Sequence, residues 1–171
     1  MTKLFILSNN KNRQRGFTLI EMIIYVSLLS LLLLVLTDIF TSSLDVRLES
    51  QSFSSVEQDS RFITTRLTYD LHRAQNISIP ANIGDQGSIM QITIDGNNYS
   101  YDLSNNNLTI NSNLGTNQLN SYNTRVSALS FKRVGNPGGK NDIIISFTLS
   151  SISQKTAGPA TKNISLTAGI R

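Results

Sequence analysis

The chain has 171 residues, with 15 Lys and Arg, 11 Asp and Glu, and no cysteine. That length gives room for one folded domain, and the lack of cysteine excludes disulfides, a thiolate nucleophile and thiolate metal ligands. The formal charge of +4 belongs to residues 1–16, which hold no acid and four basic residues: Lys3, Lys11, Arg13 and Arg15. Residues 17–171 therefore carry equal numbers of acidic and basic side chains and have no net charge to attract phosphates, which argues against direct nucleic-acid binding.

An apolar run extends from Phe17 to Leu36 and is interrupted by one charged residue, Glu21. As a helix of about 20 residues it would be about 30 Å long, enough to cross the hydrocarbon core of a bilayer. Its apolar residues surround the whole helical circumference, so we predict a transmembrane helix rather than an amphipathic one. The basic residues before it predict a cytoplasmic N-terminus and an exported C-terminal part.

Two other interpretations of this segment remain open. A secretory signal would need a cleavage site, for which only Thr41-Ser42-Ser43 is available, and its apolar region would be unusually long. A plain membrane anchor would leave Glu21 as a tolerated interfacial residue. An ionised carboxylate inside a bilayer costs about 2.5–3.5 kcal/mol, less near the end of a helix, so its presence favours a positively charged partner.

The stretch Arg15-Gly16-Phe17-Thr18-Leu19-Ile20-Glu21, between a short basic leader and an unbroken apolar helix, resembles the class III leader of type IV pilins and type II secretion pseudopilins. The resemblance implies that a prepilin peptidase cleaves between Gly16 and Phe17 and then N-methylates the new Phe17 amine. A residue as small as glycine suits a protease that must approach the scissile backbone closely. In filaments of this family the glutamate is thought to neutralise the N-terminal amine of a neighbouring subunit, which gives Glu21 a role in assembly, more through specificity than through net stability.

Residues 37–80 are predicted to continue the helix. The polar stretch Thr37–Ser43 predicts a soft point. Between Leu44 and Asn76 apolar residues recur at spacings of three and four, which predicts one amphipathic helix that ends near Asn76, before Pro80. The apolar face comprises Phe53, Val56, Ile63, Leu67, Leu71 and Ala74, and charged residues are expected on the other faces: Glu57, Asp59, Arg61, Arg66, Asp70 and Arg73. A coiled-coil dimer is disfavoured because heptads are few.

The remaining residues predict an antiparallel β-sheet. Strands are expected at 89–94, 99–103, 108–111, 126–134, 141–152 and 163–170, with turns at 95–98 and 135–139 and a polar surface loop through residue 123. The alternating apolar residues of 141–152 should cover the amphipathic helix. The predicted fold is α+β and pilin-like, a long N-terminal helix packed on an antiparallel sheet. Its expected parts are a cleaved basic leader (1–16), a transmembrane and assembly helix (17–36), a helix continuation (37–80) and a globular sheet region (81–171).

No catalytic set is evident in the sequence. His72 is the single histidine and lacks a recognisable partner, so neither general-base catalysis nor a zinc site is expected. Asp85, Asp95 and Asp102 lack the spacing of a calcium loop. We therefore predict no enzyme, no cofactor and no metal.

The resemblance implies a structural subunit of a type IV pilus, or of a type II secretion or competence pseudopilus. Its looser features favour a minor subunit. Expected partners are other pilin or pseudopilin subunits, prepilin peptidase, an inner-membrane assembly platform and membrane lipid. The alternative is a single-span, membrane-anchored exported binding domain or enzyme unrelated to filaments. DNA capture would require one basic patch formed by Arg125, Lys132, Arg133 and Lys140.

Overall fold

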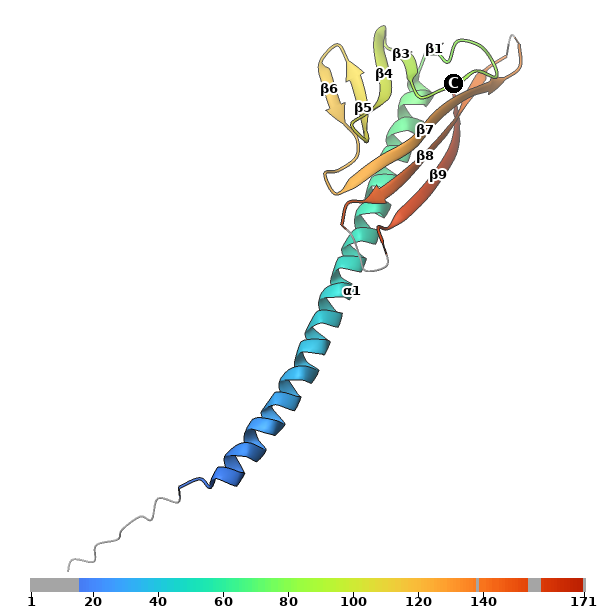
Figure 1. Cartoon of the computed structure of the whole chain (residues 1–171). Coiled ribbons are helices and arrows are strands. Elements are labelled where there is room, and N and C mark those ends of the chain that lie inside the picture. Colours follow the sequence, from blue (N-terminus) through green and yellow to red (C-terminus); the bar gives the residue numbers. More distant parts are fainter. Residues whose placement is uncertain (1–15, 138, 154–157, 171) are drawn as a thin grey trace, which may run out of the picture. The chain divides into compact units, whose positions relative to one another are not determined.

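A computed structural model describes residues 16–137, 139–153 and 158–170. Apart from Gly16, the predicted leader lies outside these residues. Contacts divide the chain into two compact units, residues 1–43 and 44–171. A single long helix, α1 (Leu19–Arg73), precedes a series of β-strands (Figure 1). The strands are β1 (Asn76–Ile79), β2 (Gln86–Gly87), β3 (Met90–Ile94), β4 (Asn97–Ser104), β5 (Asn107–Ser112), β6 (Gly115–Gln118), β7 (Thr124–Gly135), β8 (Asn141–Ser151) and β9 (Thr161–Gly169).

Helix α1 passes through the predicted soft point, and residues 37–43 are helical. The Thr37 hydroxyl donates to the Leu33 carbonyl at 2.8 Å, and the Thr41 hydroxyl donates to the Asp38 carbonyl at 3.0 Å. Because these side chains bond back onto the helix, they do not draw the backbone into another conformation. The helix ends at Arg73, slightly before the predicted end. Residues 76–79, predicted as part of the helix continuation, instead form β1 beside β3.

The buried face of α1 differs from the prediction at its start. Val56, Ile63 and Leu67 are buried as expected, but Phe53 is 54% exposed and the neighbouring Ser52 is buried in its place. A helix turns by about 100° per residue, so the stripe that contains Val56 passes through residue 52 and leaves residue 53 to one side. The apolar character of Phe53 was therefore a misleading signal.

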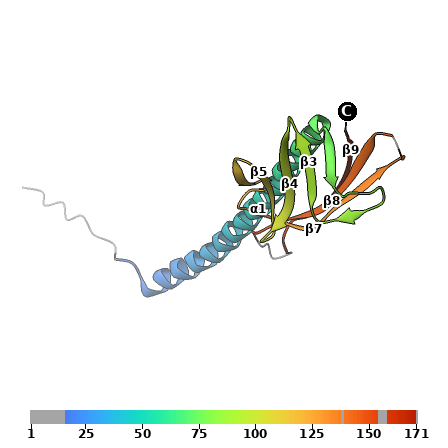
Figure 2. The ribbon, with the colours of Figure 1, turned by 90° about the horizontal axis from the view of Figure 1, so that it is seen from above.

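The strands form two antiparallel sheets rather than the single predicted one. The first has the order β1-β3-β4-β5-β6 and the second the order β2-β7-β8-β9. Figure 2 shows β3, β4 and β5 of the first sheet and β7, β8 and β9 of the second. In the first, β3 and β4 are joined by the tight turn Asp95-Gly96, where both residues have positive φ (49° and 77°), as the mirror-image turns of hairpins require. The connection predicted as a polar loop contains β6, which pairs with β5 through its backbone although its side chains are all exposed.

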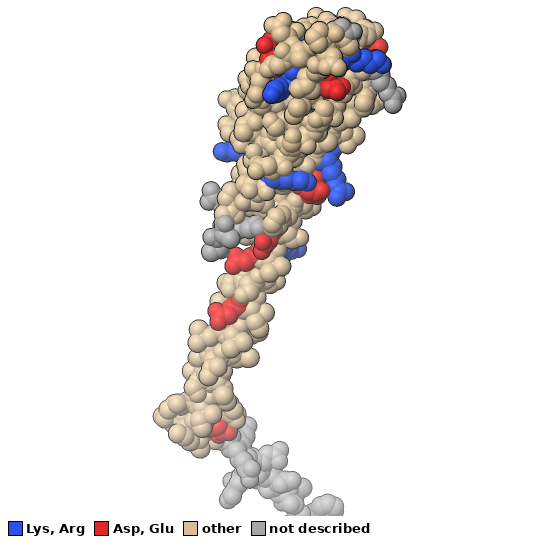
Figure 3. Space-filling view, turned by 90° about the vertical axis from the view of Figure 1, so that its right-hand side faces the viewer, with Lys and Arg blue, Asp and Glu red and all other residues tan. Residues whose placement is uncertain are grey.

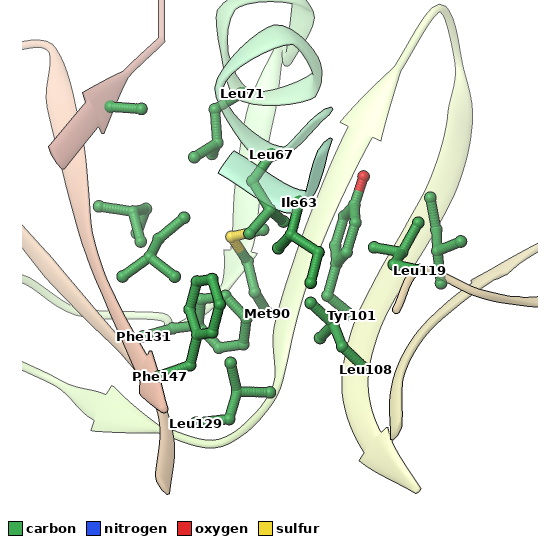
Figure 4. Close-up of a cluster of buried hydrophobic side chains, with 14 of the residues drawn as sticks. Ile63, Leu67, Leu71, Met90, Tyr101, Leu108, Leu119, Leu129, Phe131 and Phe147 are labelled. Carbon is green, nitrogen blue, oxygen red and sulfur yellow. The ribbon is translucent and has the colours of Figure 1, made fainter. Parts of the chain in front are cut away.

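The core of the second unit surrounds the C-terminal part of α1. Ile63, Leu67 and Leu71 of the helix lie among side chains from both sheets (Figure 4). The first sheet contributes Met90, Tyr101 and Leu108, and the second contributes Phe131 and Phe147. The alternating residues of β8 that were predicted to cover the helix are all buried: Ile143, Ile145, Phe147 and Leu149.

Two carboxylates predicted for the polar faces of α1 are instead buried, Asp59 and Asp70. Asp70 Oδ2 accepts hydrogen bonds from the Tyr101 hydroxyl and from Arg66 Nε, both at 2.6 Å. Burial raises the pKa of the Tyr101 phenol above its usual range, and the hydrogen bond to Asp70 raises it further. The buried carboxylate is tolerated because it has a cationic partner and a hydroxyl donor, and it links the helix to β4.

We expect the free energy of unfolding to fall as pH rises above about 10, because the unfolded chain then releases the phenol proton that folded Tyr101 retains. Replacement Tyr101→Phe should remove this decline. Near neutral pH the same replacement should destabilise the protein by about 1–3 kcal/mol, since buried Asp70 loses a donor. Urea unfolding at neutral and alkaline pH measures both effects. Tyr122→Phe, at a tyrosine that is 91% exposed, is the control; an undiminished alkaline decline in Tyr101→Phe would contradict the expectation.

Candidate processing and assembly site

The first turn of α1 is closed by Thr18 and Glu21. The Thr18 carbonyl accepts the first helical hydrogen bond, from Met22 N at 3.1 Å. The Thr18 hydroxyl accepts from Glu21 N at 3.3 Å, which places Thr18 at the N-cap position. Glu21 is then the third residue of the helix, where its negative charge is favoured by the helix dipole. The sequence Thr18-Leu19-Ile20-Glu21 thus starts the helix and fixes Glu21 one turn from the predicted cleavage point.

A tyrosine not singled out from the sequence joins this group. The Tyr25 hydroxyl donates to Glu21 Oε1 at 3.2 Å. The Tyr25 ring also meets the Phe17 ring edge to face, with centroids 6.0 Å apart and planes at 79°. Glu21 and Tyr25 are four residues apart on the helix and so share one face, and the ring contact brings Phe17, which precedes the helix, to the same group. The spacing of Tyr25 from Glu21 was the signal that could have identified it.

The predicted cleavage point is open. Gly16 is exposed, Phe17 is 70% exposed, and both precede the first helical residue. A Cβ atom added to Gly16 would meet no atom within 4 Å, so a larger side chain there would not clash with the described part of the chain. From Gly16 onward, the described residues therefore leave the Gly16–Phe17 peptide bond uncovered.

The helix that follows is apolar on its exposed surface. Its apolar part is long enough to cross a membrane, and none of it is buried within the structure, which is consistent with a single-pass membrane anchor. The hydroxyls within it are satisfied internally: Ser27 donates to the Ile24 carbonyl and Ser30 to the Val26 carbonyl, both at 2.8 Å. A side chain that bonds to its own helix can be placed in hydrocarbon without an unpaired donor.

The other candidates from the sequence do not gather into a site. His72 is exposed on α1. Asp85 accepts from Asn82, Asp95 pairs with Arg73, and Asp102 accepts from Thr109. Within the described ranges, no three His, Asp or Glu side chains lie together in an arrangement that could hold a metal ion.

The four cations considered for DNA capture do not form one patch. Arg125 and Lys132 lie seven residues apart on β7, which corresponds to about 20 Å along an extended strand. Arg133 Nη1 donates to the carbonyls of Ile77, Pro80 and Ala81, so this guanidinium holds the chain that follows β1. On the face shown in Figure 3, Lys and Arg are scattered among uncharged and acidic residues.

Residues 11–37 match the family model described as the prokaryotic N-terminal methylation motif. No curated protein and no solved structure matched the chain in the corresponding searches. The matched segment contains Gly16, Phe17 and Glu21 and the beginning of α1. The motif supports a precursor of the pilin or pseudopilin type, which prepilin peptidase processes and which assembles with other pilin subunits.

The chain therefore joins a prepilin-type methylation motif to a pilin-like α+β architecture, and this motif supports its membership of the type IV pilin and pseudopilin family, a family of structural subunits rather than enzymes.

Proposed function

We propose that the chain is a minor structural subunit of a type IV pilus, or of a type II secretion or competence pseudopilus. In this proposal the leader is removed between Gly16 and Phe17, the Phe17 amine is methylated, and the apolar part of α1 holds the subunit in the inner membrane and then in the filament. The observation that carries the proposal is the grouping of Phe17, Glu21 and Tyr25 at the start of an exposed apolar helix.

Cleavage changes the electrostatics of this group. Before cleavage the Phe17 nitrogen is a neutral amide, and after cleavage it is a cationic amine beside a layer of low dielectric constant. Opposite charges attract more strongly in such a layer than in water, so Glu21 gains a natural partner. Tyr25 already donates to one carboxylate oxygen, which leaves the other for an amine. Pairing Glu21 with the Phe17 amine of a neighbouring subunit would set the axial register between subunits.

The proposed topology follows from the charge distribution around α1. The basic leader stays in the cytoplasm, residues 17–36 span the inner membrane, and the unit of residues 44–171 is exported. The subunit contacts lipid, the inner-membrane assembly platform and other pilin-type subunits in turn. We favour a minor subunit because the helix around Asp70 and Leu71 and the closing strand β9 resemble the larger minor members of the family.

We expect Glu21→Ala to be processed normally and yet to reach the filament fraction at about a tenth of the wild-type amount or less, because a fixed charge pair in low dielectric is lost. Mass spectrometry of the membrane-bound protein reads the processing, and quantification of sheared filaments reads the incorporation. Asp38→Ala is the matched control, since it removes another carboxylate from the same unit. Normal assembly of processed Glu21→Ala would contradict the pairing role.

The alternative function predicts a different protein terminus. A membrane-anchored exported binding domain or enzyme would keep Met1 or would lose its apolar segment at an ordinary signal site. The intact mass of the wild-type protein distinguishes the cases, because the proposal requires a chain that begins with a methylated Phe17 and remains in the membrane. A protein that still begins at Met1, or a soluble one trimmed beyond residue 36, would rule the proposal out.

A further inference from the structure

A polar hollow of about 380 Å³ lies in the second unit, where the turn between β4 and β5, the end of β6 and the start of β7 meet. This volume is within the range of small-molecule sites, roughly 300–1,000 Å³. The residues that line it and could contact a ligand are Asn105, Asn106, Asn107, Gln118, Tyr122 and Arg125. Ile152 is the one aliphatic residue among its described lining. We call this set the amide hollow.

Several amide groups of the hollow are available to a ligand. The side chains of Asn105 and Asn106 make no hydrogen bond within the described residues, and both residues have positive φ (50° and 63°) in a two-residue turn. Asn107 uses Oδ1 to accept from Asn120 Nδ2 at 3.1 Å, and Gln118 uses Nε2 to donate to the Asn120 carbonyl at 2.8 Å. The Nδ2 of Asn107 and the Oε1 of Gln118 remain, so the hollow offers both donors and acceptors.

An aromatic ring and a cation complete the lining. Tyr122 is 91% exposed and so presents its ring to solvent. The guanidinium of Arg125 is exposed and has no ion pair within the part of the chain that the structure describes. A tyrosine held in the open supplies a large amphipathic contact surface at a small cost in side-chain entropy, which is why tyrosines are frequent in binding sites.

Buried polar groups hold this lining in place. Asp59 of α1 is only 7% exposed, and its Oδ2 accepts from Ser121 N and Ser121 Oγ, both at 2.8 Å, and from Thr124 Oγ1. These bonds fix the residues on both sides of Tyr122. A buried carboxylate needs hydrogen-bond donors to compensate for its lost hydration. Here the donors come from an exposed loop, so Asp59 holds that loop against α1. A site fixed before binding loses less entropy when a ligand arrives.

The hairpin side of the hollow is fixed in the same way. Asn120, 4% exposed, accepts from Leu108 N at 2.9 Å and donates to the Thr124 carbonyl at 2.9 Å. The Asn106 carbonyl accepts from Val126 N at 2.8 Å, which joins the tip of the β4–β5 hairpin to β7. The backbone that carries the free amides of the hairpin is therefore tied to the backbone at the start of β7, close to Tyr122.

We propose that the amide hollow binds a neutral carbohydrate, one or two rings of an oligosaccharide. Neighbouring sugar hydroxyls each donate and accept, as the free amides of Asn105 and Asn106 do, and Gln118 Oε1 adds an acceptor. The apolar C–H face of a sugar ring can stack on Tyr122, as apolar groups do on aromatic faces. An apolar peptide side chain or a lipid chain would find one aliphatic residue in the lining, and a nucleic acid would find one cation, where phosphate binding draws on several.

The test uses the full chain in dodecylphosphocholine micelles, because detergents with sugar head groups would compete. Saturation-transfer NMR is recorded with chitotriose, with maltotriose and with a short single-stranded oligodeoxynucleotide. We expect transfer to the ring protons of at least one sugar. Tyr122→Ala should weaken that sugar's affinity at least about tenfold, as removal of a central aromatic contact does. The double replacement Asn105→Gly with Asn106→Gly should also weaken it about tenfold, because glycine keeps the left-handed turn while it removes the amides.

Leu114→Ala is the control, since Leu114 is 96% exposed and does not line the hollow; its sugar binding should equal that of the wild type. Thermal melts by circular dichroism verify that each variant is folded. The proposal is overturned if neither sugar receives saturation from the wild type, or if the oligodeoxynucleotide alone does. It is equally overturned if sugar binding survives unchanged in the folded Tyr122→Ala protein or in the double variant.

Discussion

Gly16→Leu should leave the chain as an unprocessed precursor in the membrane, with maturation slowed by about a hundredfold or more. To cleave at the proposed point, the peptidase must bring its reacting groups to within bonding range of the Gly16–Phe17 bond, and a displacement of about 1 Å at that step can lower a rate by two orders of magnitude. Among the described residues the new side chain has free space around it, because a Cβ at Gly16 meets nothing within 4 Å there. The defect should therefore lie in processing and not in folding.

Mass spectrometry of membrane fractions after a pulse of synthesis measures the ratio of precursor to mature protein. Gly16→Ala is the matched variant, since it adds a single methyl group and should mature faster than Gly16→Leu. Circular dichroism of both purified precursors should show the same thermal transition as the wild-type precursor. Maturation of Gly16→Leu at the wild-type rate would show that the peptidase does not depend on a small residue before the cleaved bond.

Asp70→Ala should lower the free energy of unfolding by about 3 kcal/mol. The replacement leaves the buried Tyr101 hydroxyl without its acceptor and removes the partner of Arg66. Breaking a buried pair costs about 3–5 kcal/mol, and the lower value applies because the Arg66 side chain is 43% exposed and can be hydrated. Urea unfolding of the full chain in micelles, followed by near-ultraviolet circular dichroism, reports the loss of packing around Tyr101.

The comparison for Asp70 is Glu57→Ala. Glu57, like Asp70, is a paired carboxylate, and its partners are Arg61 and Lys162. The hydrogen bond from Lys162 lowers the pKa of the Glu57 carboxyl. Its side chain is 46% exposed, however, so water replaces the lost partners and the change in stability should be small. If the two alanine variants were equally stable, burial of Asp70 would not be the source of the effect. The double variant Asp70→Ala with Tyr101→Phe should recover part of the loss, because no unpaired hydroxyl then remains.

The predictions from sequence succeeded where a local pattern and the tertiary structure agree. The helical spacing of Ile63, Leu67 and Leu71 correctly predicted the buried face of α1. The alternation of apolar and polar residues within β8 correctly predicted the strand that covers this face. The Asp95-Gly96 turn gave the β3–β4 hairpin. In each case a few neighbouring residues determine the structure, so a short window of sequence is sufficient.

The predictions failed where residues far away in the sequence determine whether a segment pairs as a strand or a side chain is buried. Strand β6 is held by backbone pairing with β5, and its four exposed residues show no apolar alternation that a pattern could detect. Asp59 and Asp70 had the spacing of surface charges, and they are buried because Thr124 and Tyr101, 65 and 31 residues later, supply donors. The division into two sheets likewise depends on which strands pair, and strand periodicity carries no information about that.

At the proposed processing site, the sequence motif predicted roles for Gly16, Phe17 and Glu21, which stay predictions, and it gave no role to Thr18 or Tyr25. Thr18 is a cap whose signature, a threonine three residues before a glutamate, was present in the sequence. The contact of Tyr25 with both Phe17 and Glu21 depends on side-chain orientation, which spacing alone only permits.

The hydrogen bonds that the hydroxyl groups of α1 make within the helix affect how easily the helix can move from lipid to a position among other helices. Ser27, Ser30 and Thr37 each donate to a carbonyl three or four residues earlier in the same helix. These hydroxyl donors are satisfied whether the helix is surrounded by lipid or packed on other helices. Transfer of the helix from lipid to other helices therefore breaks none of these hydrogen bonds. The balance between a reserve of subunits in the bilayer and subunits already extracted from it would then be decided by close packing and by charge at the helix start.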